Sequence, residues 1–336
     1  MASIPTRVPV PGSDRAALPG ARSTGPVDPG ERIQVTVLVR PRASAQPSAE
    51  AIGSSPPSKR RHLTREEFSS AHGADASDLT KVEAFAHEHG LDVTEISAAR
   101  RSVVLSGTVA AFSDAFGVAL ERYVHPGGTY RGRTGPVHVP AALADVVQGV
   151  FGLDDRPQAK PHNRRRNDAP GAQPHAAGTS YTPLEVARLY NFPNGDGRGQ
   201  CIGIIELGGG YRAAELKSYF AQLGVHAPHV TAVSVDGAHN TPGVDTNADG
   251  EVLLDIEVAG AIAPGARLAV YFAPNTDSGF LDAITKAVHD THRRPSVISI
   301  SWGGPESSWT AQSLQAYDQA LQAAAVLGVT VCCASG

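Results

Sequence analysis

Two acidic residues four positions apart, Glu251 and Asp255, are the first candidates for chemistry in this 336-residue sequence. They lie in the helix-like run 249–260, so both carboxylates project from one helix face, which they share with Val258 and Ile262. Like charges at this spacing cost roughly a few tenths of a kcal/mol when exposed, and more when partly buried. General acid/base work would account for that cost. Acids in the first two turns of a helix also complement its dipole, so the pair alone leaves both interpretations open.

Further polar residues follow two apolar runs that have the character of buried strands. Glu206 follows the run 201–205, and the segment Ser301-Trp302-Gly303-Gly304-Pro305 follows the run 296–300. In a parallel sheet, active groups gather where strands end at their carboxyl termini. We therefore expect Glu206 and Trp302 to lie near the acidic pair, at the mouth of a cleft.

The second half of the chain alternates apolar runs with helix-like stretches. The runs, which are typical of strands buried on both faces, cover residues 201–205, 268–272, 296–300 and 329–333. The helix-like stretches cover about residues 213–223, 250–262, 279–290 and 311–327. This order predicts a parallel, doubly wound α/β sheet over residues 180–336.

The first half predicts a separate, ferredoxin-like α+β domain over residues 31–154. Its first strand begins near Glu31, with alternate apolar residues on one face, and Thr64 and Glu67 have the spacing of a helical capping box. Further elements follow the same reasoning: a helix from about Ser77 to Gly90, a strand over 101–106, a helix over 109–116 and a strand over 119–124. Two helices on one face of a small antiparallel sheet would account for the order.

Two stretches lack periodicity. Residues 1–30 are rich in Pro, Gly, Ser, Ala and Arg, and we expect a disordered tail. Residues 155–179, which include Arg164-Arg165-Arg166, have the composition of a linker. Three arginines could bind nucleic acid, but in a spacer they favour a solvated, protease-accessible segment.

The overall composition limits the kinds of molecule that the chain is expected to bind. With 41% apolar residues, 18% charged residues and a formal net charge of −4, the chain has no general attraction for nucleic acid or an anionic membrane. It contains no apolar run of about 18 residues, and Met1–Arg32 lacks the apolar stretch of a secretory signal. Cys201, Cys332 and Cys333 lack metal-ligand spacing, and we expect free thiols buried on strands.

Two motifs that suggest metals fail on spacing. Asp245–Gly250 fits the first half of a calcium loop, but its twelfth position is Ile256, where a glutamate is needed. His87-Glu88-His89 lacks the four-residue separation of zinc-protease histidines and is interpreted as a solvated helix end. No metal ligand is therefore assigned.

The stretch from Tyr181 to Gly336 resembles the first half of the catalytic domain of the sedolisin family of serine-carboxyl peptidases. Residues 31 to about 154 resemble the activation prodomain of that family. The catalytic resemblance rests on Tyr181-Thr182-Pro183, on Ile205–Tyr211, on Gly250-Glu251-Val252 with Leu254–Val258, on Val270–Asp277, and on Ser299–Glu306.

The resemblance implies roles for the candidate residues. It implies a subtilisin-like fold in which Glu251 is the general base, Asp255 orients it, and Glu206 and Trp302 extend their hydrogen-bond chain. A histidine base would be protonated in acid, whereas a carboxylate can still accept a serine proton, so low-pH proteolysis follows. The crowded carboxylates should titrate as a coupled set, with one keeping its proton to higher pH. The backbone of Ser301, Gly303 and Gly304 would pair with an extended peptide.

The resemblance also implies parts that this sequence does not supply. The family's Gly-Thr-Ser nucleophile, its oxyanion aspartate and its calcium ligands would lie beyond Gly336, so no cofactor is expected within the chain and we expect negligible activity from it alone. Gly178-Thr179-Ser180 has the nucleophile's letters but precedes Glu251, which is the wrong chain order. Protein or peptide substrates, a prodomain on its own cleft, autoprocessing and an extracellular location are likewise implied, although no signal peptide is visible.

A second class of function stays open. The chain could be a non-catalytic inhibitor or chaperone whose prodomain caps the cleft of a related peptidase. Ordinary subtilisin-type catalysis would need a histidine at position 251, where this sequence has a glutamate.

Overall fold

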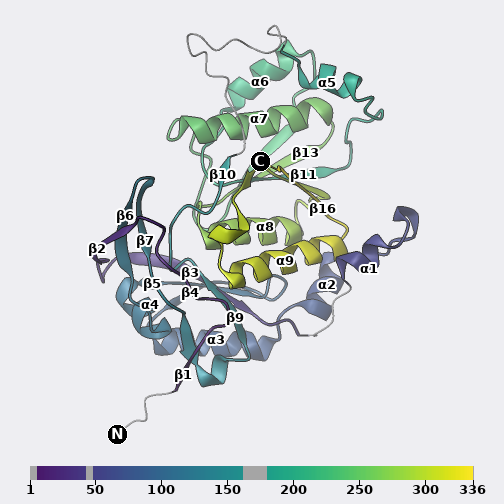
Figure 1. Cartoon of the computed structure of the whole chain (residues 1–336). Helices are drawn as coiled ribbons and strands as arrows, with labels where there is room; N and C mark the ends of the chain where they lie inside the picture. Colours follow the sequence, from purple (N-terminus) through teal and green to yellow (C-terminus); the bar gives the residue numbers. More distant parts are fainter. Residues whose placement is uncertain (1–5, 43–47, 162–179, 336) are drawn as a thin grey trace. The chain divides into compact units, whose positions relative to one another are not determined.

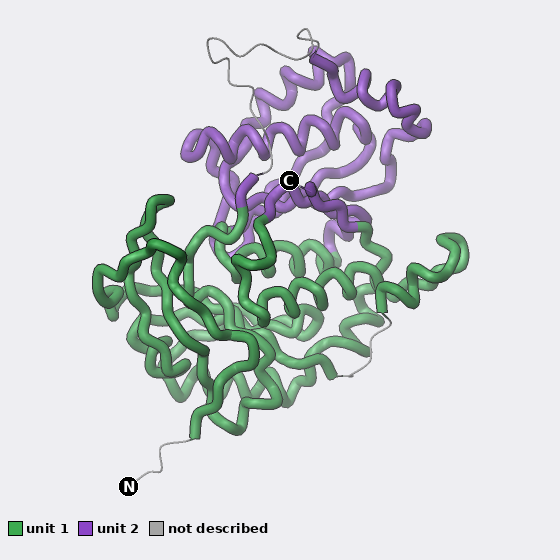
Figure 2. The backbone as a smooth tube through the Cα atoms, in the orientation of Figure 1, with its two compact units in different colours: residues 1–159, 274–291, 304–330 green, residues 160–273, 292–303, 331–336 purple. Residues whose placement is uncertain are grey.

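The computed structural model describes residues 6–42, 48–161 and 180–335. The chain divides into two compact units (Figure 2), and each is described by itself. Unit 1 comprises residues 1–159, 274–291 and 304–330, and unit 2 comprises residues 160–273, 292–303 and 331–336. Arg164-Arg165-Arg166 and Gly178-Thr179 lie outside the described residues.

Unit 1 contains three antiparallel sheets (Figure 1). The largest has the strand order β4-β5-β3-β9, the second β2-β6-β7, and the third pairs β1 with β8. The strands are β1 (Arg7–Pro9), β2 (Arg22–Pro26), β3 (Arg32–Val39), β4 (Asp92–Ser97), β5 (Ser102–Thr108), β6 (Glu121–His125), β7 (Gly128–Gly132), β8 (His138–Pro140) and β9 (Val147–Phe151). The helices are α1 (Ala49–Gly53), α2 (Arg65–His72), α3 (Ala76–Glu88), α4 (Val109–Phe116), α8 (Asp277–His289) and α9 (Ala311–Val326).

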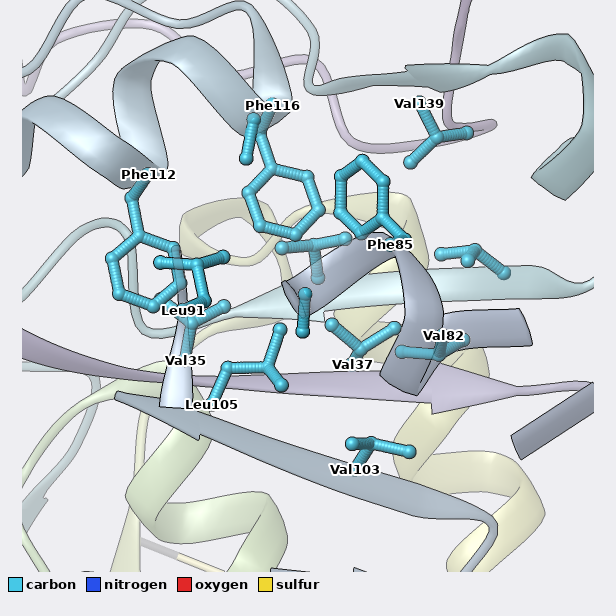
Figure 3. Close-up of a cluster of buried hydrophobic side chains, with 14 of the residues drawn as sticks. Val35, Val37, Val82, Phe85, Leu91, Val103, Leu105, Phe112, Phe116 and Val139 are labelled. Carbon is cyan, nitrogen blue, oxygen red and sulfur yellow. The ribbon is translucent and has the colours of Figure 1, made fainter. Parts of the chain in front are cut away.

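One face of the four-stranded sheet carries the main core of unit 1. Val35, Val37 and Val39 alternate along β3 and are at most 1% exposed, as the sequence spacing predicts. Phe85 of α3 and Phe112 of α4 pack into the same cluster (Figure 3). The two helices therefore cover this face, and their apolar side chains fix the register of β3 against it.

The opposite face of this sheet contacts α8 and α9. Thr36, which points away from the valine face, donates a 2.5 Å hydrogen bond to Asp282 of α8. Gln312 of α9 donates from Nε2 to the carbonyl of Val150 in β9 at 2.9 Å. Two helices expected in the second half of the chain are thus part of unit 1. The division into compact units does not locate the site at which a precursor is cut. The expected end of the prodomain at residue 154 and the expected start of the catalytic part at residue 180 therefore remain predictions.

The expectation of a disordered tail over residues 1–30 is wrong for the described part, which begins at Thr6. Strand β1 pairs with β8, and β2 pairs with β6. Val10 and Val27 are 2% and 4% exposed. Loop-like composition is compatible with ordered structure here because the pairing partners lie more than 90 residues away, beyond the reach of any local pattern.

The capping box expected at the start of α2 is present. The hydroxyl of Thr64 accepts a hydrogen bond from the backbone of Glu67, and the Glu67 carboxylate accepts one from the backbone of Thr64 at 2.8 Å. Two otherwise unsatisfied backbone donors are paired in this way, which stabilises the first turn.

Unit 2 is built on one five-stranded sheet with the order β12-β13-β11-β14-β16. Its registered pairs β12–β13, β11–β13 and β11–β14 are parallel, as the apolar runs predicted. The strands of the unit are β10 (Lys160–Pro161), β11 (Cys201–Glu206), β12 (His229–Ser234), β13 (Arg267–Phe272), β14 (Val297–Ile300), β15 (Trp302–Gly303) and β16 (Thr330–Cys333), and its helices are α5 (Pro183–Leu189), α6 (Ala213–Gln222) and α7 (Thr246–Ile262).

Helices α6 and α7 pack on this sheet. Phe220 of α6 and Ile256 of α7 share a core with Ile204 and Val270, and all four side chains are fully buried. Asp245 of the half calcium loop is the N-cap of α7, where it accepts from the backbone of Asn247 and Ala248. That segment is therefore helical rather than a metal loop.

The cysteines are only partly where we expected them. All three are free thiols, and Cys201 is buried. Cys332 and Cys333 are exposed, so the expectation of buried thiols is wrong for this pair, which lies on the terminal strand of the sheet order. No helix in the described part of the chain is both long enough and apolar enough to cross a membrane.

Candidate active site

The candidate site of unit 2 forms where β11 and β14 end. These strands pair in parallel with Ile205 opposite Ile300, so Glu206 and Ser301 follow at the same edge of the sheet. Helix α7, which packs on the sheet, supplies Glu251 and Asp255. The three elements that the sequence pointed to are therefore brought together.

Glu206 is the most deeply buried acid of the site, with no exposed surface. Its Oε2 accepts a 2.9 Å hydrogen bond from the indole Nε1 of Trp302, and its Oε1 has no hydrogen-bond partner among the described residues. Burial raises the pKa of Glu206 well above its ordinary value, and the negative charges of Asp255 and Glu251 raise it further, against the opposing effect of the Trp302 bond. Glu206 is therefore protonated when a free glutamic acid would already be charged.

Asp255 is held by a residue from the other side of the site. The hydroxyl of Ser301 donates a 2.9 Å hydrogen bond to Oδ1 of Asp255. Burial raises the pKa of Asp255 to about 6, although the Ser301 bond works in the opposite direction. Asp255 thus changes its charge in mildly acidic solution, where an ordinary aspartate is already ionised.

Glu251 lies one turn before Asp255 on α7 and is 2% exposed. Its negative charge raises the pKa of Glu206, which lies at the end of β11. The helix face that Glu251 shares with Val258 is not buried throughout, since Val258 is 42% exposed. Three interacting carboxyl groups can retain, share and transfer protons at acidic pH, which is the chemistry of a general acid/base site.

A close approach of backbone fixes α7 against the loop that follows β11. Gly209 has φ +70°, and a Cβ at this position would lie 2.5 Å from the carbonyl carbon of Ala248. Asn240 holds the next part of the loop, because its side chain accepts from the backbone N–H of Tyr211 at 2.7 Å and donates to the carbonyl of Tyr211 at 3.0 Å. The glycine cluster therefore lets the first turn of α7, and with it Glu251, come close to the sheet.

The backbone expected to hold substrate is already paired. Strand β15 lies antiparallel to β10, with Lys160 opposite Gly303 and Pro161 opposite Trp302. Gly304 follows, and a Cβ there would lie 2.9 Å from the carbonyl oxygen of Gln158, so only glycine fits this approach without a shift. Strand β10 could not be found from the sequence, because two residues ending in proline carry no periodicity.

Comparison with known proteins identifies relatives along the whole chain. Residues 19–156 match the family model described as Pro-kumamolisin, activation domain. Kumamolisin of Bacillus sp. (strain MN-32) is 52% identical over 333 residues, covering 97% of this chain and 60% of kumamolisin. Tripeptidyl-peptidase sed5 of Aspergillus fumigatus is 30% identical over 88% of this chain and 55% of its own length. The chain thus spans only a little over half the length of these relatives.

A solved structure of Pseudomonas sedolisin, a serine-carboxyl proteinase complexed with two molecules of pseudo-iodotyrostatin, aligns at 24% identity with a TM-score of 0.43. The alignment covers 48% of this chain and 45% of that one. From its sequence relatives and the match to the activation domain, the chain is similar to members of the sedolisin family.

Proposed function

We propose that this chain is part of the precursor of a serine-type endopeptidase that cleaves proteins or peptides at acidic pH. The observation that carries the proposal is the buried group of interacting carboxyl residues, Glu206, Glu251 and Asp255. Proton retention by such a group in mildly acidic solution suits a carboxylate base better than a histidine, which would be protonated there.

Each residue has a role in the proposal. Glu251 takes the proton of the attacking hydroxyl, and Asp255 orients it. Glu206, held by Trp302, keeps a proton that would otherwise leave three negative charges in one buried site. The nucleophile, the oxyanion aspartate and the calcium ligands implied by the family resemblance are assigned to none of residues 1–336, so the proposed mechanism contains no metal-dependent step.

Strand β10 supports autoprocessing from a proform. Lys160 and Pro161 follow the activation-domain match and lie antiparallel on β15, which is how an extended peptide substrate would add to an edge. A precursor whose own chain lies on this edge is inhibited until it is cut. By the same family resemblance, we place the mature enzyme outside the cell.

The proposal also includes a ferredoxin-like fold for the prodomain and a subtilisin-like fold for the catalytic part. The strand order β4-β5-β3-β9, with helices between β3 and β4 and between β5 and β9, supports a ferredoxin-like prodomain. The parallel pairs around β11 support a subtilisin-like catalytic sheet.

The decisive experiment grafts residues 180–336 in place of the matching part of kumamolisin and measures peptide cleavage between pH 3 and pH 7. We expect acid-pH turnover that falls about 10³–10⁴-fold in kcat with Glu251→Gln, because removing a member of a catalytic unit abolishes most of its acceleration. Glu257→Gln is the matched control, since Glu257 lies on the same helix but is not one of the three acidic residues of the site. Retained activity in Glu251→Gln would refute the role of the base.

Assayed alone, the 336 residues are expected to give no turnover, since no nucleophile is assigned to them. Turnover by these residues that depends on Glu251 would show that the nucleophile has been misplaced, while leaving the role of the base intact.

An inhibitor is the second candidate, and β10 is the observation that favours it. A chain segment that already occupies β15 could occupy the equivalent edge of a related peptidase. Residues 1–161, which contain both residues of β10 and the ordered segment that begins at Thr6, would be added to intact kumamolisin to test this. Unchanged kumamolisin turnover at a large excess of the fragment would eliminate the inhibitor.

A further inference from the structure

Arg101 of unit 1 combines three energetically unfavourable features. It is 8% exposed, its φ of +56° lies in the left-handed region, and no carboxylate among the described residues pairs with it. A residue with a Cβ rarely adopts that backbone conformation, and a buried charge ordinarily has a counter-charge. Such a position calls for an interaction that the chain alone does not provide.

The hydrogen bonds of Arg101 go only to neutral acceptors. Its Nη1 donates to the carbonyl of Val39 at 3.4 Å and to Oε1 of Gln148 at 3.2 Å, and its Nη2 donates to Oε1 of Gln319 at 2.7 Å. A guanidinium has five N–H donors, so Nε–H and one Nη2–H remain for another acceptor. The positive charge itself is not compensated.

Other buried arginines of the described chain differ in this respect. Arg100, the sequence neighbour, pairs with Glu95, and the following buried arginines each have a carboxylate within ion-pair distance: Arg15, Arg131 and Arg156. Arg133 also has no carboxylate within ion-pair distance among the described residues, but Asp277 and Asp154 oppose the lowering of its pKa by burial. Burial lowers the pKa of Arg101 to about 10 with no carboxylate opposing it. Among the buried arginines of the described chain, Arg101 is the one with neither an ion-paired carboxylate nor a carboxylate that opposes the effect of burial on its pKa.

Arg101 borders a polar cavity of about 830 Å³ that lies wholly within unit 1. Segments far apart in the sequence surround it: the residues that follow β3, the start of α3, β9 and α9. Gln148 and Gln319 also line the cavity, and their Nε2 groups have no hydrogen-bond partner among the described residues. The wall around Arg101 therefore offers several unused N–H donors.

The carboxylates of the cavity are engaged elsewhere. Asp78 accepts from Arg40 at 2.6 Å and from Lys81 at 2.9 Å. Asp75 lies 3.9 Å from Arg42. The third acid, Asp318 of α9, accepts from its own helix through Nε2 of Gln322 at 2.7 Å. These pairs leave the charge of Arg101 without a partner.

We propose that this cavity binds a small oxyanion, for which inorganic phosphate is the probe, on the guanidinium of Arg101. A guanidinium presents its donors in a planar fork that matches two oxygens of such an anion. The free amide groups of Gln148 and Gln319 donate to the remaining oxygens. The anion supplies the counter-charge that Arg15, Arg100, Arg131 and Arg156 obtain from an aspartate or glutamate.

The test measures the thermal unfolding midpoint of the 336-residue chain in 0 to 20 mM phosphate against chloride of equal ionic strength. We expect a saturable rise of about 3 °C in phosphate, because a ligand that binds the folded state raises its stability. Arg101→Gln should lose the rise, while Arg122→Gln, which alters a partly exposed arginine paired with Glu31, should keep it.

Gln319→Glu decides the question if Arg101→Gln does not fold. It places a carboxylate where the amide oxygen now lies 2.7 Å from Nη2, so we expect a higher midpoint in chloride and no response to phosphate. Gln222→Glu, the same change on an exposed part of α6, should leave the response intact. No phosphate response in the unaltered chain, or a response that survives both Arg101→Gln and Gln319→Glu, would overturn the proposal.

Discussion

The indole N–H of Trp302 points at Oε2 of Glu206, 2.9 Å away, inside a site where that carboxyl group has no exposed surface. Glu206 is the last residue of β11 and Trp302 lies just beyond the end of its parallel neighbour β14, so the bond closes the end of the sheet. It favours the charged form of Glu206, while burial favours the protonated form more strongly. This balance governs the first prediction.

Replacing Trp302 by Phe should remove the donor and leave Oε2 of Glu206 unsatisfied. We expect the pKa of Glu206 to rise further and the free energy of unfolding to fall by about 2 kcal/mol. Carbon-13 NMR of the glutamate carboxyls and urea unfolding would measure the two effects. Trp309→Phe is the control, because the indole nitrogen of Trp309 has no hydrogen-bond partner among the described residues. Equal losses in the two variants would argue against the Glu206 bond.

Asp255→Asn should make the chain more stable at neutral pH but not in acid. Because the folded pKa is about 6 and the ordinary value is 3.8, the folded state retains a proton longer, and stability declines as pH rises from about 4 to 6. The difference amounts to at most about 3 kcal/mol above pH 6. Unfolding curves at pH 4 and pH 7 test this, with the exposed Asp92→Asn as control. An equal change at both pH values would contradict the prediction.

Gly209→Ala should be much more damaging than Gly224→Ala. Both glycines have φ near +70°, so both substitutions carry backbone strain of about 1 kcal/mol. A Cβ at Gly224 meets nothing within 4 Å, whereas at Gly209 it meets the backbone of Ala248 and Asp249 at 2.5 and 2.6 Å. We expect at least about 2 kcal/mol of additional destabilisation. Chemical unfolding of the two variants checks it, and similar losses would show that α7 shifts freely.

His289→Phe should flatten the acid side of the stability profile. Burial, with Arg100, Arg65 and Arg101 nearby, lowers the pKa of His289 to about 3 from an ordinary value of 6.5. Between these values the unfolded chain binds a proton that the folded chain does not, so stability is full above pH 6.5 and falls as pH decreases toward 3, by up to about 5 kcal/mol. Phe can occupy the place of the ring beside Phe68.

The stability profile of the His289→Phe chain would be measured by unfolding at intervals from pH 7 to pH 4. His125→Phe, a change at a residue on β6, provides the comparison. A slope that is unchanged by the loss of His289 would mean that other groups cause the acid sensitivity.

Local sequence patterns were sufficient for the buried strands. Strand β11 could be predicted because it is a continuous apolar run, and the valine face of β3 because its apolar residues alternate with polar ones. The proximity of Glu206 and Trp302 could be predicted because each comes at the end of a predicted parallel strand, and such strands end at one edge of the sheet. The acidic pair of α7 was expected at the same edge. Their roles as base, orienting acid and supporting network remain predictions.

Other features could not be read from local patterns. Strand β12 has one buried residue and mixes polar with apolar residues, so it is not the continuous apolar run that marked the other buried strands. Strands β1 and β2 depend on distant partners, and their proline and glycine content indicates loops. An amphipathic pattern predicts that α8 buries one face, but it does not say that Asp282 will meet Thr36.

The pairing of β10 with β15 affects how well a free peptide can compete for this edge. Lys160 and Pro161 belong to the same molecule as Gly303 and Trp302, so their local concentration at this edge is of roughly millimolar order. A peptide present at micromolar levels competes poorly with such a tethered rival. Cutting the covalent connection dilutes the rival into bulk solvent, and a change in chain connectivity alone then opens the edge to other peptides.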